Sequence, residues 1–260
     1  QTSSRHLESL ERAAFINAFN FDRRLGVGVA SSGDRYTFKA GLFGENANDE
    51  AGANDEGTAI AARFTFNPVN ENGRIVHLGA SAQHREAADG DLFRYRARPQ
   101  IHLSDRFVDT GAFADEDTFL GVEAAYIAGP FHISGELARL ETDGALADAS
   151  FEGGYVEAGF FLTPGDAKGY KGGAFDRTKP ARSINDGGIG AWELRGRFDQ
   201  LNLEDGSIMG GEQTATTVGV NWFATDYLRF LGEYTYADIE DGPDGSGDVQ
   251  AFSLRAAIDW

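Results

Sequence analysis

The fold is decided by a nine-residue stretch at the end of the chain, Phe252-Ser253-Leu254-Arg255-Ala256-Ala257-Ile258-Asp259-Trp260. Large apolar side chains alternate in it with polar or small ones. In an extended strand one face would therefore be apolar, and the other would carry Ser253, Arg255 and Asp259. This period of two predicts a β-strand that continues to the last residue.

The same alternation recurs along most of the chain. In 192–198, Trp192, Leu194 and Phe198 alternate with Glu193, Arg195 and Arg197. In 228–236, apolar and aromatic residues alternate with Arg229, Glu233 and Thr235. Similar patterns predict strands over 24–31, 35–44, 58–67, 74–84, 91–98, 105–112, 118–128, 131–141, 152–163 and 212–223, which makes thirteen with the three above.

Acidic residues are concentrated in segments that lack this alternation. The formal net charge is −18, which argues against nucleic acid as a partner. Five segments hold 20 of the 41 acidic residues and none of the 23 Lys and Arg: 45–57, 113–117, 141–152, 204–212 and 238–248. They are rich in Gly, Asn and Ser, so they are predicted to be long solvated loops.

Strands of about 9 to 11 residues, apolar on one face and charged on the other, are typical of a transmembrane β-barrel. No run of 18 apolar residues occurs, so a helical membrane protein is excluded. Cysteine is absent, which excludes disulfides and thiol chemistry. The sequence predicts an all-β, antiparallel transmembrane barrel with about thirteen strands visible. A soluble sandwich or lipocalin-like barrel is the alternative.

Loop lengths predict the topology. In bacterial barrels the short turns are periplasmic and the long loops extracellular, and single-chain barrels have an even number of strands. Thirteen is odd, so we expect at least one strand to precede Gln1, and three more would complete sixteen. Residues 1–23 are expected to form an extracellular or lumen-folded loop with a short helix over 7–15. The barrel strands and loops then occupy 24–260.

One connection breaks the short-turn rule. Residues 163–187 are periplasmic by this topology, yet the segment is long and basic, and its cations are Lys168, Lys171, Arg177, Lys179 and Arg182. Two interpretations stay open. The segment folds back into the lumen and sets its charge, or it is a solvated periplasmic loop.

Several stretches resemble a known family. They are Arg23-Arg24-Leu25-Gly26-Val27-Gly28-Val29, Arg94-Tyr95-Arg96-Ala97-Arg98-Pro99, Asp105-Arg106-Phe107-Val108-Asp109-Thr110-Gly111, Tyr170-Lys171-Gly172-Gly173-Ala174-Phe175, Gly190-Ala191-Trp192-Glu193-Leu194-Arg195-Gly196-Arg197-Phe198 and Thr217-Val218-Gly219-Val220-Asn221-Trp222. Together with the last strand they resemble the phosphate-selective porins of Gram-negative outer membranes. The resemblance implies a sixteen-stranded barrel, a homotrimer and passive conduction of small anions, phosphate-like ones included.

The resemblance also implies a pathway of basic side chains. The matching positions are Arg94, Arg96 and Arg98, then Arg195 and Arg197, together with the basic 163–187 connection. Alternation alone puts Arg94, Arg96 and Arg98 on one face, and three arginines facing lipid would cost about 2 to 4 kcal/mol each near the midplane, so that face must be the lumen. The alternative is that lumen acids pair with these arginines and leave the pore merely polar: Glu123, Glu157, Glu193, Asp199 and Glu233.

The function expected from the sequence is therefore an outer-membrane anion porin. The alternatives are a general diffusion porin and a structural barrel whose acidic loops bind a surface partner such as lipopolysaccharide-bound cations or another surface layer. Outer-membrane lipid and lipopolysaccharide are expected to surround the barrel. Phe252, Leu254, Ile258 and Trp260 resemble the signal read by the barrel-assembly machinery. No metal-ligand spacing among the five histidines and no Gly-x-Ser-x-Gly motif is found, so no enzyme, metal or cofactor is expected. The acidic run 238–244 lacks EF-hand spacing for Ca²⁺.

Overall fold

A computed structural model describes residues 4–21, 23–46, 57–71, 73–144 and 147–259. It confirms the all-β fold class, because fifteen strands account for most of the described chain. The regular helices there are short: a 3₁₀ turn, η1 (Ser4–His6), a five-residue helix, α1 (Ala14–Ala18), and a second 3₁₀ turn, η2 (Ile184–Asp186). No helix in this part of the chain is long and apolar enough to cross a membrane.

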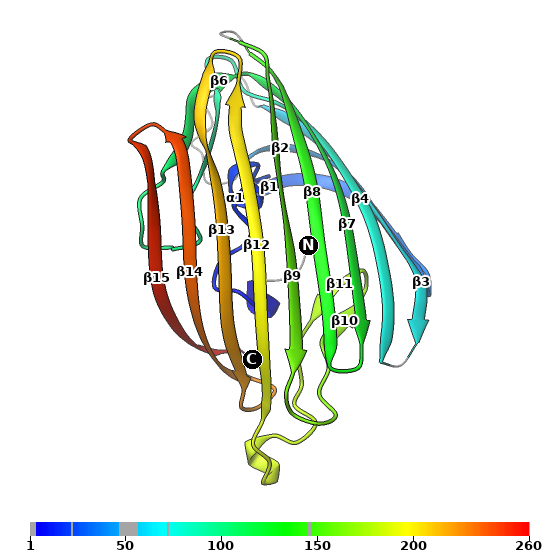
Figure 1. The fold of residues 1–260 in the computed structure, drawn as a ribbon. Helices are drawn as coiled ribbons and strands as arrows, with labels where there is room; N and C mark the ends of the chain where they lie inside the picture. Colours follow the sequence, from blue (N-terminus) through cyan, green and yellow to red (C-terminus); the bar gives the residue numbers. More distant parts are fainter. Residues whose placement is uncertain (1–3, 22, 47–56, 72, 145–146, 260) are drawn as a thin grey trace.

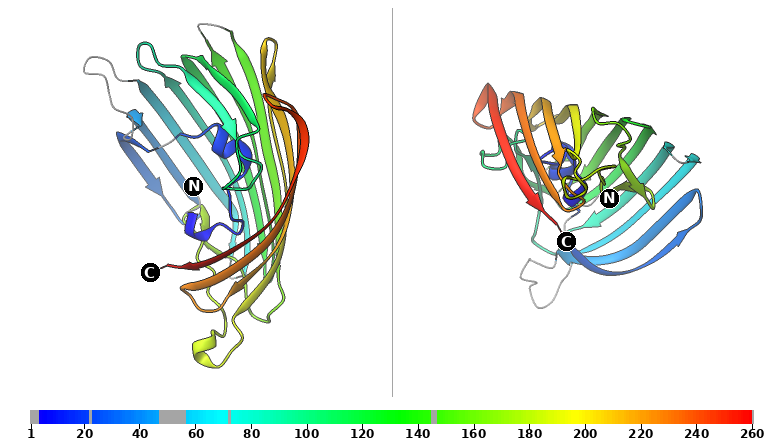
Figure 2. Two further views of the ribbon diagram at one scale, coloured as in Figure 1. Left: turned by 90° about the vertical axis from the view of Figure 1, so that its left-hand side faces the viewer. Right: turned by 90° about the horizontal axis from the view of Figure 1, so that it is seen from below.

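Eleven strands form one antiparallel sheet, in which each strand pairs with the next one along the wall. In chain order they are β1 (Arg24–Ser32), β2 (Tyr36–Asn46), β3 (Thr58–Glu71), β4 (Arg74–Glu86), β7 (Glu116–Ala128), β8 (Phe131–Asp143), β9 (Ala149–Phe161), β12 (Ala191–Asp205), β13 (Ile208–Phe223), β14 (Leu228–Gly242) and β15 (Gly245–Ile258). The sheet bends into an open trough (Figure 2). Among the described residues no pairing joins β1 to β15, so the trough is not a closed barrel.

The two faces of this wall differ as the alternation predicts. On β12, Glu193, Arg195 and Arg197 are buried on the concave face, whereas Leu194 and Phe198 are exposed on the convex face. Val218 on β13 and Leu254 on β15 are likewise exposed. The apolar side chains therefore face outward, as they do when lipid takes the place of a core.

Two of the predicted wall strands do not belong to the wall. Residues 91–98 and 105–112 were expected to be barrel strands, but the structure makes them a separate hairpin of β5 (Phe93–Ala97) and β6 (Val108–Ala114), and β4 pairs directly with β7. The hairpin folds onto the concave face and contacts β12, β13 and β14. A ribbon lying on another surface also has one buried and one open face, so it shows the same period of two as a wall strand.

The two ends of the wall have different connections (Figure 1). At one end, here called the turn end, neighbouring strands are joined by short turns such as Gly129-Pro130, where Gly129 adopts φ +56° as a tight turn requires. The other end, the loop end, carries the acidic segments. The prediction of long loops over 204–212 and 238–248 is wrong, because both segments are extended hairpins. Strands β12 and β13 are joined by the two-residue turn Gly206-Ser207, and strands β14 and β15 by the turn Pro243-Asp244. Residues 47–56 of the segment 45–57 lie outside the described residues.

Three inserted pieces occupy the concave side: the N-terminal segment (residues 4–21), the β5–β6 hairpin and a smaller hairpin, β10 (Gly169–Lys171) with β11 (Ala174–Asp176). The main apolar cluster lies beneath the first two, and Phe15, Tyr95 and Phe151 are among its fully buried members. The apolar core of the described chain is thus inside the trough, where it fixes these pieces to the wall.

Candidate anion pathway

The concave face of β12 carries a row of four charges, Glu193, Arg195, Arg197 and Asp199. Arg195 donates to Ser9 Oγ at 2.6 Å, forms a close ion pair with Glu233 on β14, and lies 3.8 Å from Glu157 on β9. All four side chains are buried. Arg195 is therefore neutralised by wall acids, which is the alternative left open by the sequence.

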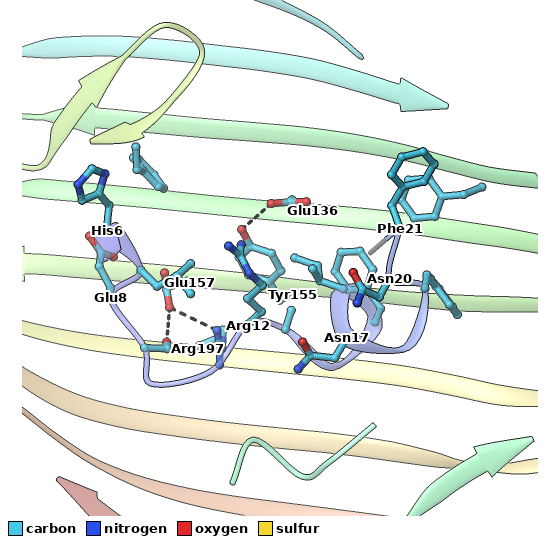
Figure 3. Close-up of a pocket in the computed structure, with 18 residues that line it drawn as sticks. His6, Glu8, Arg12, Asn17, Asn20, Phe21, Glu136, Tyr155, Glu157 and Arg197 are labelled. Atoms are coloured by element: carbon cyan, nitrogen blue, oxygen red, sulfur yellow. Dashed lines mark hydrogen bonds and ion pairs between the residues drawn. The ribbon is translucent and has the colours of Figure 1, made fainter. Parts of the chain in front are cut away.

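Arg197 has a similar environment. Its Nη2 donates to Gln100 Oε1 at 2.6 Å and its Nη1 donates to the Glu11 carbonyl at 3.0 Å. Glu157 lies 3.9 Å away (Figure 3). The structure thus places both predicted wall arginines beneath the N-terminal segment, where they hold that segment and the tip of the β5–β6 hairpin.

The N-terminal segment is bound to the wall chiefly through its backbone. Wall side chains donate to the carbonyls of Leu7, Glu8 and Glu11, and the donors are Arg229, Asn221 and Arg197. The Ala14 N–H donates to Asp199 at 3.1 Å, and the Leu10 N–H donates to Glu233 at 3.2 Å. A helix over 7–15 would need these groups for its own hydrogen bonds. The predicted helix is therefore wrong over 7–13, and α1 begins only at Ala14.

The remaining predicted arginines lie on the open face of the β5–β6 hairpin. Tyr95 and Ala97 are each 1% exposed and pack toward the wall, while Arg94 and Arg96, which alternate with them, face the other way. Arg98 follows with its Nε bonded to the Ser104 carbonyl at 2.9 Å. Arg106, from the same hairpin, is exposed and electrostatically coupled to all three. We call Arg94, Arg96, Arg98 and Arg106 the hairpin arginines.

One carboxylate accompanies these four cations. Asp109 accepts two hydrogen bonds from Arg94, at 2.6 and 2.5 Å. Partial burial acts to raise the pKa of Asp109, but hydrogen bonds from Arg94 and the Gly111 N–H and the nearby charges of Arg94 and Arg96 together outweigh it, so the pKa lies below its ordinary value. Arg96 and Arg106 have no hydrogen bond or ion pair to any described residue. Partial burial, and after it the positive charges of the neighbouring arginines, lower the pKa of Arg106.

One part of the basic 163–187 connection folds into the trough, as the first interpretation of the sequence predicts, and the other part does not. Its β10–β11 hairpin folds into the trough: the Gly173 carbonyl accepts a 2.8 Å bond from Arg63 on β3, and Tyr170 Oη lies 2.7 Å from His77 Nδ1 on β4. Lys168 is buried beside it, 2.6 Å from Glu8 Oε1, and Lys171 is exposed at its tip.

The rest of the connection stays at the turn end. Arg177 pairs with Asp259 at 3.2 Å and lies over the Tyr227 ring. Lys179 and Arg182 are exposed there. The five basic residues of the connection are thus not brought to one place, and only Lys168 and Lys171 lie with the inserted pieces.

A buried cluster missed by the sequence analysis joins the N-terminal segment to the wall. Ligand atoms of Glu8, His132 and Glu193 lie within 4.8 Å of one another, a set that resembles a metal site. However, the Lys168 ammonium is 2.6 Å from Glu8, so a cation already balances this charge. These residues come from three distant parts of the chain, and no local spacing could have revealed them.

The proposed assembly signal lies on the last strand. Phe252, Leu254 and Ile258 are each at least 70% exposed on the convex face of β15. Trp260, the fourth residue of the signal, lies outside the described residues. The structure therefore shows an outward apolar row at the end of the chain.

Comparisons with known proteins agree with this architecture. The family model "Phosphate-selective porin O and P" matches residues 1–260. An uncharacterised protein of Caulobacter vibrioides is 37% identical over 96% of this chain and 54% of its own length. Porin O of Pseudomonas aeruginosa is 27% identical over 86% of this chain and 57% of its own length. The chain therefore spans about half the length of these curated relatives, and it belongs to the phosphate-selective porin O and P family of outer-membrane proteins.

Proposed function

We propose that the protein is an outer-membrane porin that conducts small anions, phosphate-like ones among them, and that the hairpin arginines provide its selectivity. One observation carries the proposal: an inward-folded hairpin gathers four arginines around one carboxylate, and two of them are unpaired. Family membership points to a channel rather than an enzyme, and the matched family is described as phosphate-selective.

The chemistry of the hairpin arginines suits passing anions. A guanidinium presents planar pairs of donors that match phosphate or carboxylate oxygens. Because Arg94 is already held by Asp109 and Arg98 by a carbonyl, only part of the positive charge is free to attract an ion. Several weak sites in a row let an ion enter without being trapped. Arg195 and Arg197 act in this proposal as anchors of the inserted pieces, since their donors are engaged by Ser9, Gln100 and wall carboxylates.

The test is the reversal potential of single channels under a salt gradient, measured on the full-length protein. Changing Arg94, Arg96 and Arg98 together to Glu should leave the barrel folded and shift the preference several-fold from anions toward cations. A matched control changes Arg35, Arg74 and Arg139 to Glu, which reverses the same number of charges at exposed positions away from the hairpin. An identical permeability ratio in the hairpin triple variant and the wild type would contradict the proposal.

The pairing of charges on the wall favours a second function, that of a general diffusion pore. The pairing of Arg195 with Glu233 and Glu157 cancels charge where a selective ladder would need it free. In that case the wild type itself would show no anion preference. Homotrimer formation, assembly by the barrel-assembly machinery and contact with lipopolysaccharide remain predictions from the family resemblance.

A further inference from the structure

The β5–β6 hairpin depends on other parts of the chain for its position, because its own strand pairing is irregular. Four residue pairs join the two strands, and the register shifts on either side of Arg94. Shifts of this kind leave residues out of the ladder and bend the strand. The orientation of the hairpin arginines is therefore set largely by what holds the hairpin to the wall.

One anchor lies near the base of the hairpin, where the chain leaves β4 and returns to β7. Tyr95 is buried there, and its Oη donates to Asp117 on β7 at 2.7 Å. Asp117 is in turn closely paired with Arg85 on β4. This anchor fixes the base of the hairpin, and the tip needs an attachment of its own.

The anchor of the tip is Gln100, which is 4% exposed although it lies in a turn. Its Oε1 accepts a 2.6 Å hydrogen bond from Arg197 Nη2 on β12. Asp199, the next residue on that face of β12, is also a hydrogen-bond partner of the Gln100 side chain. A side-chain amide carries both an acceptor and a donor, so Gln100 can bond to a wall cation and a wall carboxylate at once.

The backbone at Gln100 has an uncommon conformation. Its φ is +63°, in the left-handed region that residues with a Cβ rarely adopt. Its N–H donates to the Arg98 carbonyl at 2.9 Å, across Pro99, whose ring fixes φ. The same carbonyl accepts a 3.2 Å hydrogen bond from Gln213 on β13. Strain of this kind persists where several contacts impose it, and it points to a functional constraint on the turn.

The anchored turn is directly connected to the hairpin arginines. Arg98 is two residues before Gln100, and its Nε donates to the Ser104 carbonyl at 2.9 Å, which closes the tip into a small loop. Arg106 follows two residues after Ser104, and Arg96 precedes Arg98 by two. A displacement of the turn would therefore move three of the four hairpin arginines together.

We infer that Gln100 is a positioning residue for ion selection, which ties the tip of the hairpin to Arg197 and Asp199 and so holds the hairpin arginines at a fixed place in the trough. Gln100 faces the wall and contacts no ion itself. Without this tie the hairpin stays attached at Tyr95, while its tip moves and the positive charge is spread over a larger volume. The role in selection rests on the proposed function, whereas the tie itself does not.

The tie is tested by a distance measurement on the full-length protein in detergent. Spin labels are placed on Leu103→Cys at the tip and Thr214→Cys on β13, since both positions are exposed and the chain has no cysteine of its own. Pulsed electron double resonance should give one narrow distance distribution. Gln100→Met, which keeps the side-chain length and loses both polar groups, should broaden it. Gln100→Glu, which keeps an acceptor for Arg197, should stay narrow, as should the control Gln250→Met at an exposed position of β15.

The consequence for selection is tested by the reversal potential of the unlabelled Gln100→Met channel under a salt gradient. It should shift toward cation preference, because the arginines no longer concentrate positive charge along the ion path. The shift should be smaller than that of the triple variant in which Arg94, Arg96 and Arg98 are changed to Glu. Heat-modifiable migration on a cold gel verifies the fold of each variant.

The outcomes separate this inference from the proposed function. A distribution in Gln100→Met that is as narrow as in the wild type overturns the inference. So does a wild-type reversal potential in Gln100→Met when the triple variant shifts, and in both cases the proposed function stands. If the triple variant itself keeps the wild-type potential, the proposed function fails and the role of Gln100 in selection fails with it, while a broadened distribution still establishes the tie.

Discussion

The wall arginines of β12 and the hairpin arginines have the same sequence pattern and opposite environments. Arg195 and Arg197 alternate with apolar residues, and so do Arg94 and Arg96. The first pair is buried under the N-terminal segment among Glu157, Glu233 and backbone carbonyls. The hairpin arginines lie on an open face and share one carboxylate. Alternation therefore identifies the face of a strand, whereas the inserted pieces decide which charges on that face stay free.

The largest expected effect is the loss of stability when a wall arginine is replaced. Arg195→Gln leaves Glu233 without its cation in a buried position, and losing one partner of a buried pair costs about 3–5 kcal/mol. We expect a large fall in the unfolding midpoint of the refolded barrel in urea. Arg96→Gln, the control, should stay within about 0.5 kcal/mol of the wild type. Equal stabilities for the two variants would contradict the view that Arg195 anchors the inserted pieces while Arg96 has no structural role.

A smaller effect should follow from freeing Arg94. Asp109→Asn removes the single paired carboxylate of the hairpin, so the anion-to-cation permeability ratio should rise. The reversal potential measures this change, and Asp244→Asn, at an exposed loop-end turn, removes the same charge as a control. A fall in the ratio after Asp109→Asn would mean that Asp109 positions Arg94 for the ion rather than restraining it.

The same pair predicts a pH dependence. Because the folded pKa of Asp109 lies below its ordinary value, the ion pair with Arg94 is intact at neutral pH and is lost only as the pH falls through that lowered pKa. Anion preference should therefore rise at acid pH more in the wild type than in Asp109→Asn. Reversal potentials recorded along a pH series test this, and parallel curves for the two proteins would exclude Asp109 as the titrating group.

The smallest effect is expected from the acidic hairpin at the loop end. Neutralising Asp238, Glu240, Asp241, Asp244 and Asp248 changes charges at the loop-end rim, all exposed except the half-buried Asp238. Such charges act over about 10 Å at 0.1 M salt. Electrophoretic mobility should change clearly and the permeability ratio only slightly. A reversal of selectivity would show that these acids, and not the hairpin arginines, form the filter.

Much of the wall was predictable because side chains on a strand of such a wall alternate between an apolar outer face and a polar inner face. Leu194 against Arg195 and Leu254 against Arg255 assign both faces without any knowledge of neighbours, and the structure agrees. The 163–187 connection begins at the opposite end of the wall from the acidic segments (Figure 1), and the order of strand directions along the chain requires this. These features depend on local order along the chain, which a single sequence contains.

The errors arise where contacts are distant in sequence. Tyr95 and Ala97 pack on an inner surface rather than on neighbouring wall strands, so β5 and β6 were mistaken for wall. Residues 7–13 have a helical pattern, but wall side chains bind their carbonyls. The sequence places Arg229 and Arg255 on the polar faces of their strands. Nothing local indicates that the acids nearby, Glu233 and Glu8, are paired with Arg195 and Lys168 instead.

The most direct test of the central claim is accessibility from the pore. The chain contains no cysteine, so single replacements Arg96→Cys and Arg197→Cys each introduce one reactive thiol. A negatively charged methanethiosulfonate reagent is applied while single-channel current is recorded. The structure predicts rapid modification and a changed current at position 96, and protection at position 197, which lies beneath the N-terminal segment. Rapid modification at 197 with protection at 96 would contradict the account.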